Sequence, residues 1–257
     1  MPAVDLGRIA LHYDDTGTGT VPVLLLHELG GSSASFSALF PALAADRRVI
    51  APDLRGAGRS EKPIGPFTIT DIAEDILALL DALAVPQVDI IGAALGCYVG
   101  ALLAGRHSAR VRRLVLAAVA PEIGARVVNY LTERATLVRT QGMRAAVDAS
   151  LNNAFPERHA AIRAGHRPRW LANDPAGFAE LSLALARHRV SPADWATIAQ
   201  PTLVLSGAHD FVWLPEAGRA VAASIPGARF AVLETAGHFP HLQAPEILTE
   251  LARAFLE

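Results

Sequence analysis

Six short apolar runs, each followed by a helical pattern, restrict the folds open to this chain of 257 residues. The runs are rich in leucine and β-branched residues, and they lack the polar–apolar alternation of a half-exposed strand. We interpret them as strands buried on both faces: VPVLLLH, RVIAPD, VDIIGA, VRRLVLAAVAP, PTLVLSGAHD and ARFAVLETAGH. Strands that alternate with helices in this way predict a doubly wound, mostly parallel α/β sheet.

The segments around these strands support that interpretation. TITDIAEDILALLDALAV begins with a Thr or Asp suited to cap a helix. It places five apolar residues on one stripe, which predicts an amphipathic helix: Ile72, Ile76, Leu79, Leu80 and Leu83. The N-terminal stretch VDLGRIALHYDDTGTG differs, because Gly7 separates two short alternating runs. That pattern predicts an antiparallel hairpin at the edge of the sheet.

The alternation of strands and helices stops between residues 122 and 191. This stretch is rich in arginine and has the pattern of consecutive helices. We therefore expect an α/β core made of residues 1–121 and 192–257, with a helical cap at residues 122–191. Such a cap would lie over the carboxyl ends of the strands, where α/β sheets bind their ligands.

Composition excludes several classes of function. The formal net charge of −2, with no basic run, argues against nucleic-acid binding. Charges in the first fifteen residues argue against a signal peptide, and the apolar run 90–105 is shorter than the roughly 20 residues of a membrane span. The single cysteine, Cys97, fits a reducing compartment and predicts a cytoplasmic protein; an oligomer is compatible with the sequence.

The pentapeptide GAALG, residues 92–96, follows the third predicted strand. It matches the G-x-S-x-G turn that presents a catalytic nucleophile between a strand and a helix, except that Ala94 stands where the serine would be. A turn whose glycines serve only close packing explains the same letters.

Two further loops follow predicted strands. In HELGGSS, the glycines free backbone N–H groups to face a developing oxyanion, although a helix-capping loop has the same composition. In PDLRGAGRS we expect a tight turn held by an ion pair between Asp53 and Arg55.

Asp210 and His238 come directly after the last two predicted strands. A carboxylate and an imidazole at neighbouring strand ends can form the pair in which the acid fixes the histidine tautomer. Glu122, after another strand, is a weaker candidate for the acid. The chain order of turn apex, acid and histidine at 94, 210 and 238 is the order of the α/β-hydrolases.

On the motifs HELGG, PDLRGAGRS, GAALG, GAHD and AGHFPHLQAPE, the chain resembles the α/β-hydrolase superfamily, in particular small bacterial enol-lactonases, perhydrolases and esterases. The resemblance implies that Ala94 occupies the nucleophile position, Asp210 the acid position and His238 the base position. It also implies an oxyanion hole formed by the backbone N–H groups of Leu29 and Leu95. No metal or organic cofactor is needed for this chemistry, so none is expected.

The chain departs from the family at Glu28, where glycine is usual, and at the apex alanine. Cys97 is expected to pack in the core, and the pair His238 and His241 lacks a third ligand for zinc. The arginine-rich cap favours a small carboxylate-bearing substrate over a neutral one. Candidate pocket residues are His27, Glu28, Tyr130, Trp170 and His188, with Arg126, Arg134, Arg163, His166 and Arg169 as further cap side chains.

Three hypotheses account for Ala94. The chain is an inactivated Ser→Ala variant of a hydrolase of small esters, lactones or related carbonyl compounds, which we favour because Asp210, His238 and the turn glycines are all retained. Alternatively, alanine is native, and the histidine acts as a general base in lyase, isomerase, decarboxylase or cofactor-free oxygenase chemistry. The third hypothesis is a binding protein without catalysis on the same scaffold.

Overall fold

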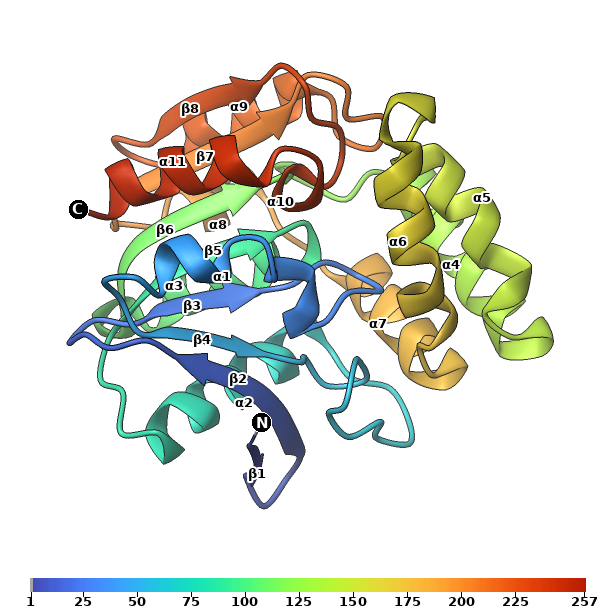
Figure 1. Ribbon diagram of the computed structural model, residues 1–257, viewed down its shortest axis with the longest axis horizontal. Helices are drawn as coiled ribbons and strands as arrows, with labels where there is room; N and C mark the ends of the chain where they lie inside the picture. Colours follow the sequence, from blue (N-terminus) through green and yellow to red (C-terminus); the bar gives the residue numbers. More distant parts are fainter. Residues whose placement is uncertain (1) are drawn as a thin grey trace.

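The computed structural model describes residues 2–257 and contains one eight-stranded sheet, ordered β1-β2-β4-β3-β5-β6-β7-β8 (Figure 1). The strands from β3 to β8 run parallel to one another, and β1 and β2 are antiparallel to their neighbours. The predicted doubly wound α/β sheet is confirmed. The strands are β1 (Ala3–Asp5), β2 (Ala10–Thr16), β3 (Val23–Leu26), β4 (Val49–Pro52), β5 (Val88–Ala93), β6 (Val111–Ala117), β7 (Thr202–Gly207) and β8 (Arg229–Leu233).

Helices cover both faces of the sheet. Alternate residues of β3 belong to two separate apolar clusters, one packed with α2, α3 and α9, the other with α1 and α11. The helices are α1 (Phe40–Leu43), α2 (Ile69–Ala82), α3 (Leu95–Arg106), α4 (Ala125–Gln141), α5 (Arg144–Ala154), α6 (Ala160–Leu171), α7 (Pro175–Arg187), α8 (Pro192–Trp195), α9 (Pro215–Ser224), α10 (Pro240–Gln243) and α11 (Pro245–Leu256), with 3-10 turns at Ser33–Phe36, Ser108–Arg110 and Glu157–His159.

Local sequence explains how several elements begin and end. Helix α2 starts after Thr68, whose hydroxyl accepts a hydrogen bond from the Asp71 N–H while the Asp71 carboxylate accepts one from the Thr68 N–H, a reciprocal cap. Strands β1 and β2 form the predicted edge hairpin, and Gly7 turns it with a φ of 76°.

The last strand differs from expectation. All six predicted strands form, but among the described residues β8 pairs only with β7, and its residues are partly exposed up to the final leucine. At the edge of the sheet, β8 has neighbouring side chains on one side only, which leaves its own side chains partly exposed. The prediction that both faces are buried is therefore wrong for this strand.

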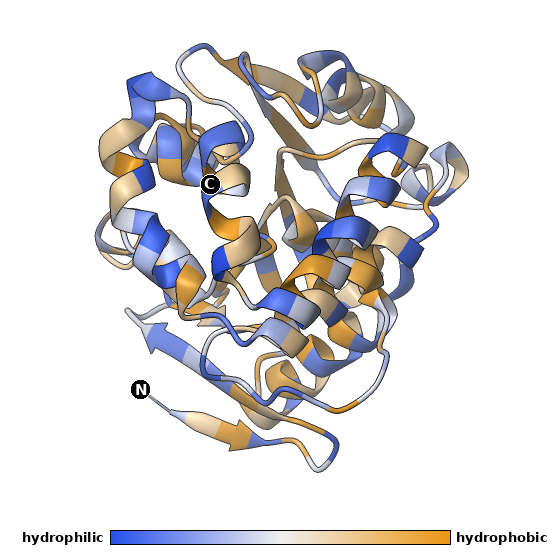
Figure 2. Ribbon diagram, turned by 90° about the vertical axis from the view of Figure 1, so that its right-hand side faces the viewer, coloured by the Kyte–Doolittle hydropathy of each residue, from blue (hydrophilic) through white to orange (hydrophobic). Residues whose placement is uncertain are grey.

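Helices α4 to α7, between β6 and β7, lie off the carboxyl ends of the parallel strands (Figure 1). We call them the helical insertion. Apolar and polar segments alternate along them, as on helices with one face against the core (Figure 2).

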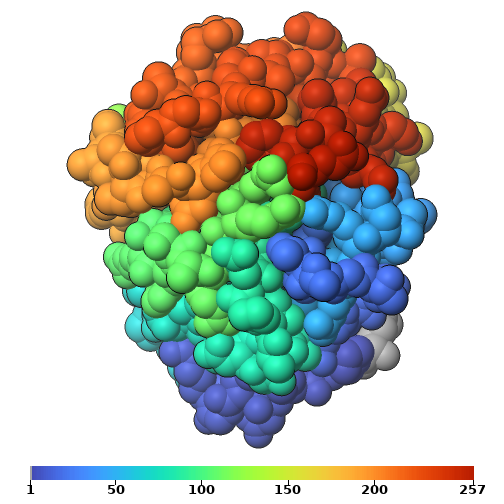
Figure 3. Space-filling view, turned by 90° about the vertical axis from the view of Figure 1, so that its left-hand side faces the viewer, coloured from blue at the N-terminus to red at the C-terminus, as the bar shows by residue number. Residues whose placement is uncertain are grey.

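The opposite side of the molecule shows the N-terminal strands at one end and the C-terminal elements at the other (Figure 3). Within residues 2–257, no helix is both long and apolar enough to cross a membrane.

The expected ion pair between Asp53 and Arg55 does not form, so that prediction is wrong. The Asp53 carboxylate accepts hydrogen bonds from the backbone N–H groups of Ser33 and Arg59, at 2.7 and 2.8 Å. The Arg55 guanidinium pairs instead with Asp75 on α2. The two side chains therefore stabilise the turn from different sides.

Candidate active site

The pentapeptide around Ala94 forms a sharp turn between β5 and α3. Ala94 has φ 47° and ψ −107°, outside the regions that residues with a Cβ atom favour. Holding a non-glycine residue there costs on the order of 1–3 kcal/mol. Such a turn exposes the apex side chain to ligand and places the Leu95 N–H at the start of a helix, where the helix dipole favours negative charge.

The glycines of the turn are required by close packing. A Cβ atom on Gly96 would lie 2.0 Å from the carbonyl oxygen of Leu26, and one on Gly92 would lie 2.7 Å from the carbonyl oxygen of Gly96. Both distances are far below van der Waals contact. The helix can therefore approach the sheet this closely only with glycine at both positions.

We expect Gly96→Ala to destabilise the protein by about 1–3 kcal/mol or more, because the added methyl group must displace the backbone of β3. The free energy of unfolding in urea measures this effect. Gly165→Ala is the matched control, since a Cβ there meets nothing within 4 Å. Equal stability of the two variants would contradict the packing explanation.

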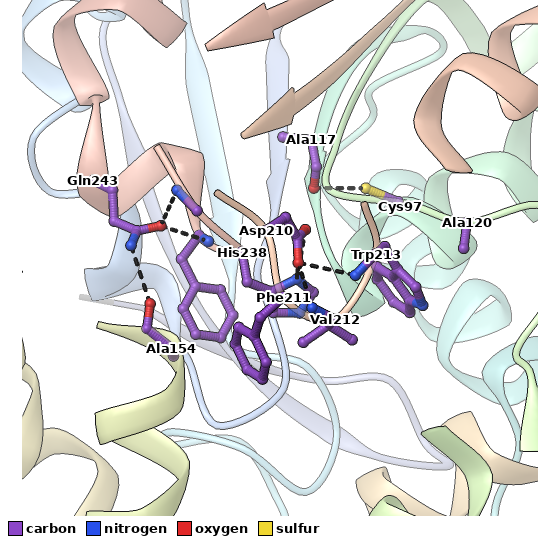
Figure 4. Close-up of polar contacts among 12 residues, drawn as sticks. Cys97, Ala117, Ala120, Ala154, Asp210, Phe211, Val212, Trp213, His238 and Gln243 are labelled. Carbon is purple, nitrogen blue, oxygen red and sulfur yellow. Dashed lines mark hydrogen bonds and ion pairs between the residues drawn. The ribbon is translucent and has the colours of Figure 1, made fainter. Parts of the chain in front are cut away.

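His238 and Asp210 are in contact, as the sequence predicts, and Glu122 is exposed at the surface. The His238 Nδ1 lies 2.9 Å from Asp210 Oδ2 and 3.1 Å from Oδ1 (Figure 4). Oδ1 also accepts hydrogen bonds from the N–H groups of Val212 and Trp213, at 2.8 and 2.9 Å. The carboxylate is thus held by backbone, and the Nε2 of His238 is left for a ligand.

Gln243 holds the loop that carries His238. Its Oε1 accepts hydrogen bonds from the N–H groups of Gly237 and Phe239, which flank the histidine, at 3.0 and 2.9 Å. Its Nε2 donates to the carbonyl oxygen of Ala154 on α5, at 3.1 Å (Figure 4). One buried amide therefore joins the histidine loop to the helical insertion.

A cavity of about 60 Å³, which we call the central cavity, lies beside the turn. This is room for about five water molecules, which suits a small ligand rather than a long acyl chain. Seven predicted site residues line it together with apolar and aromatic side chains. The lining is Leu29, Ala94, Leu95, Val127, Tyr130, Leu131, Arg134, Ser150, Ala154, Trp170, Leu185, Phe211, Val212, Trp213, His238 and Phe239.

Arg134 brings a guanidinium group into the lining of the central cavity. It is 9% exposed, its Nη1 donates to the Tyr130 hydroxyl at 3.3 Å, and its guanidinium lies over the rings of Tyr130 and Phe178. Burial lowers the pKa of Arg134, and the Tyr130 hydroxyl opposes this effect. Its Nε has no hydrogen-bond partner, and no carboxylate in residues 2–257 forms an ion pair with it.

Three of the five predicted pocket residues lie elsewhere. His27 is buried, and its ring forms hydrogen bonds with the Glu28 carbonyl oxygen and the Leu54 N–H. Glu28 points away from the central cavity and pairs with His241. His188 lines a second cavity with Tyr98, on the far side of α3 from β5. The prediction that these three residues line the pocket is wrong. The direction of a side chain decides which cavity it lines, and the sequence does not report that direction.

Sequence reasoning missed some of the residues of the candidate site. Phe211, Val212 and Trp213 directly follow Asp210, and that adjacency was a usable signal. No comparable sequence signal marked Ser150 or Gln243. Cys97 packs in the core as expected, where burial raises the pKa of its thiol.

Comparison with known proteins gives the family. The family model described as "alpha/beta hydrolase fold" matches residues 21–245. A protein from Azorhizobium caulinodans named as a carbamate hydrolase, RutD, is 27% identical over 99% of this chain and 98% of its own.

Two solved structures have the same fold. The enol-lactonase from Burkholderia xenovorans is 31% identical, has a TM-score of 0.94 and covers 99% of both chains. A thermophilic esterase from Thermogutta terrifontis, solved with malate bound, is 30% identical with a TM-score of 0.91, over 96% of this chain and 93% of its own. Together with the matching family model, these likenesses show that this chain belongs to the α/β-hydrolase fold family and resembles its small-molecule hydrolases.

Proposed function

We propose that the protein hydrolyses a small carboxylate-bearing ester, lactone or carbamate in the central cavity, with His238 as general base. One observation carries this proposal: His238 of the Asp210–His238 pair lines the same small cavity as the buried Arg134, which forms no ion pair within residues 2–257. The helical insertion supplies the arginine, so residues 122–191 act as a cap that contributes to substrate binding.

Because Ala94 has no nucleophilic atom, water attacks the substrate carbonyl in this proposal. The Nε2 of His238 takes a proton from the water as its oxygen bonds to the carbonyl carbon. The N–H groups of Leu29 and Leu95 stabilise the oxyanion. The intermediate then breaks its bond to the leaving oxygen or nitrogen, which receives the proton from the imidazolium while Asp210 stabilises the cation.

An anionic substrate is supported by the cost of burying Arg134. A buried charge without a counter-ion is unfavourable, and a ligand carboxylate would compensate it through charge-assisted hydrogen bonds. The hydroxyls of Tyr130 and Ser150, 3.1 Å apart, lie on the same side of the cavity and offer further donors. A related esterase binds malate, a small dicarboxylate.

A second candidate is the Ser-His-Asp mechanism, with serine at position 94 in the natural protein. The strained backbone of Ala94 favours it, because a packing turn alone does not call for that conformation. In that case His238 activates the serine hydroxyl, and this chain binds substrate without completing the reaction.

Arg134→Met is expected to weaken binding of monomethyl malonate by about ten- to a hundredfold, because a charge-assisted contact contributes about 1.5–3 kcal/mol. Methyl acetoacetate, of similar size but neutral, should lose less than about threefold. Titration calorimetry measures both affinities, and product release measures kcat/KM where turnover occurs.

Arg134→Lys is the matched control, since it retains the positive charge but not the planar fork, and should fall between the other two proteins. Equal losses for the charged and neutral ligands would contradict the role of Arg134 as the carboxylate anchor.

A further inference from the structure

Glu28 and His241 form a buried carboxylate–imidazole pair outside the central cavity. Both side chains are 1% exposed, and Glu28 Oε2 lies 3.0 Å from His241 Nε2. The other carboxylate oxygen accepts a hydrogen bond from the Ser35 hydroxyl at 2.9 Å. A Cβ atom on Gly31 would lie 2.4 Å from Glu28 Oε1, so the loop is shaped around this carboxylate.

The carboxylate of Glu28 stays ionised in spite of its burial. Burial alone raises its pKa, but the charge and the hydrogen bond of His241 outweigh that effect and lower the pKa to about 2. A buried carboxylate is costly without such a partner. Buried pairs of this kind are often no more stabilising than apolar side chains of similar size, so stability by itself does not explain the pair.

The pair connects the two halves of the candidate active site. Glu28 directly precedes Leu29, the proposed oxyanion donor. His241 lies on α10 with Gln243, which accepts hydrogen bonds from both residues that flank His238. The Glu28–His241 pair thus ties the loop that carries Leu29 to the short helix that holds the histidine loop.

We propose that Glu28 and His241 are a positioning pair, which sets the place of His238 relative to the oxyanion donors. This rests on the proposed function, in which both must meet one substrate. Neither residue of the pair lines the central cavity, so they act through the loops rather than on the substrate. Small displacements of catalytic groups are costly, which gives the pair a measurable effect on kcat.

The test is a double-mutant cycle with Glu28→Leu, His241→Leu and the double variant. Each single change should lower kcat by about tenfold or more, with KM within about twofold, because the substrate anchor is not moved. The double variant should lose no more than the worse single variant, since both changes remove the same connection. Losses that multiply would show independent residues and overturn the proposal.

Two conservative variants, Glu28→Gln and His241→Gln, keep a hydrogen bond and should retain kcat within about threefold. They also allow the pair to be tested if a leucine variant fails to fold.

Asp89→Asn is the matched control for a buried ion pair. Asp89 pairs with Arg47 and Arg112 at the opposite end of β5 from Ala94. It should lower stability and leave kcat unchanged. Lower stability with unchanged kcat in the leucine variants too would show a merely structural pair and overturn the proposal.

A second readout does not need turnover. The imidazole nitrogen resonances of His238 in histidine-labelled protein should shift in Glu28→Leu and stay in place in Asp89→Asn. Unchanged resonances in Glu28→Leu would overturn the positioning role. Absence of turnover in the unmodified protein, with these shifts present, would contradict only the proposed function.

Discussion

Replacing Ala94 with serine is expected to raise the rate of p-nitrophenyl acetate hydrolysis by about a thousandfold or more. In a complete triad the loss of the serine costs on the order of a millionfold in kcat, and here the acid and the base of the proposed triad are both present and in contact. His238 is already oriented by Asp210, and the apex backbone already has the strained conformation of a nucleophile turn. Stopped-flow absorbance should show a burst of p-nitrophenol, the sign of an acyl-enzyme.

Ala94→Ser combined with His238→Ala is the control, because the serine is then present without its base and the burst should disappear. A single serine variant that stays as slow as the unmodified protein would contradict the view that this turn presents a nucleophile. The unmodified protein in the same assay separates the hypotheses. Turnover of carboxylate substrates with alanine at 94 supports general-base hydrolysis, whereas tight binding without turnover supports the serine mechanism.

His238→Ala in the unmodified protein is expected to lower kcat toward a small carboxylate-bearing ester by about a hundred- to ten-thousandfold, the contribution of a positioned general base. The imidazole is the only group near Ala94 that the proposed mechanism uses to move a proton. Initial rates with monomethyl malonate measure the loss, and titration calorimetry should show affinity retained, because Arg134 is unchanged.

His188→Ala is the matched control, since His188 is also partly buried but lines the second cavity. It should leave kcat within about twofold of the unmodified protein, as for a substitution that touches no part of the reaction. Retained turnover in His238→Ala would contradict the general-base role and favour a different proton acceptor.

Much of the fold was predictable because its signals are local. An apolar run without alternation indicates a buried strand wherever it lies. The cap at the start of α2 likewise depends on only four consecutive residues, from Thr68 to Asp71. The mistake at β8 has a physical cause: a run of apolar residues reports what a strand is able to bury, while the number of its neighbours depends on sheet order.

The site was predictable in part for the same reason. Residues at the carboxyl ends of neighbouring parallel strands must lie close together, which agrees with the contact between Asp210 and His238 and with the place of His238 in the central cavity beside Ala94. Side chains farther from the strand ends carry no such constraint. Whether His188 or Trp170 enters the central cavity depends on how the insertion helices pack, and only Trp170 does.

By itself, the amino-acid sequence determined the alternation of strands and helices, the glycine-flanked turn at Ala94 and the chain order of the candidate acid and base. These features depend on hydrophobic periodicity and backbone freedom, which are properties of residues close together in the chain. The tertiary structure alone decided which charges meet. It joined Glu28 to His241 across 213 residues and, within residues 2–257, left Arg134 buried without an ion-pair partner. Such pairing is an interaction through space, and its strength depends on distance and burial that only the folded chain defines.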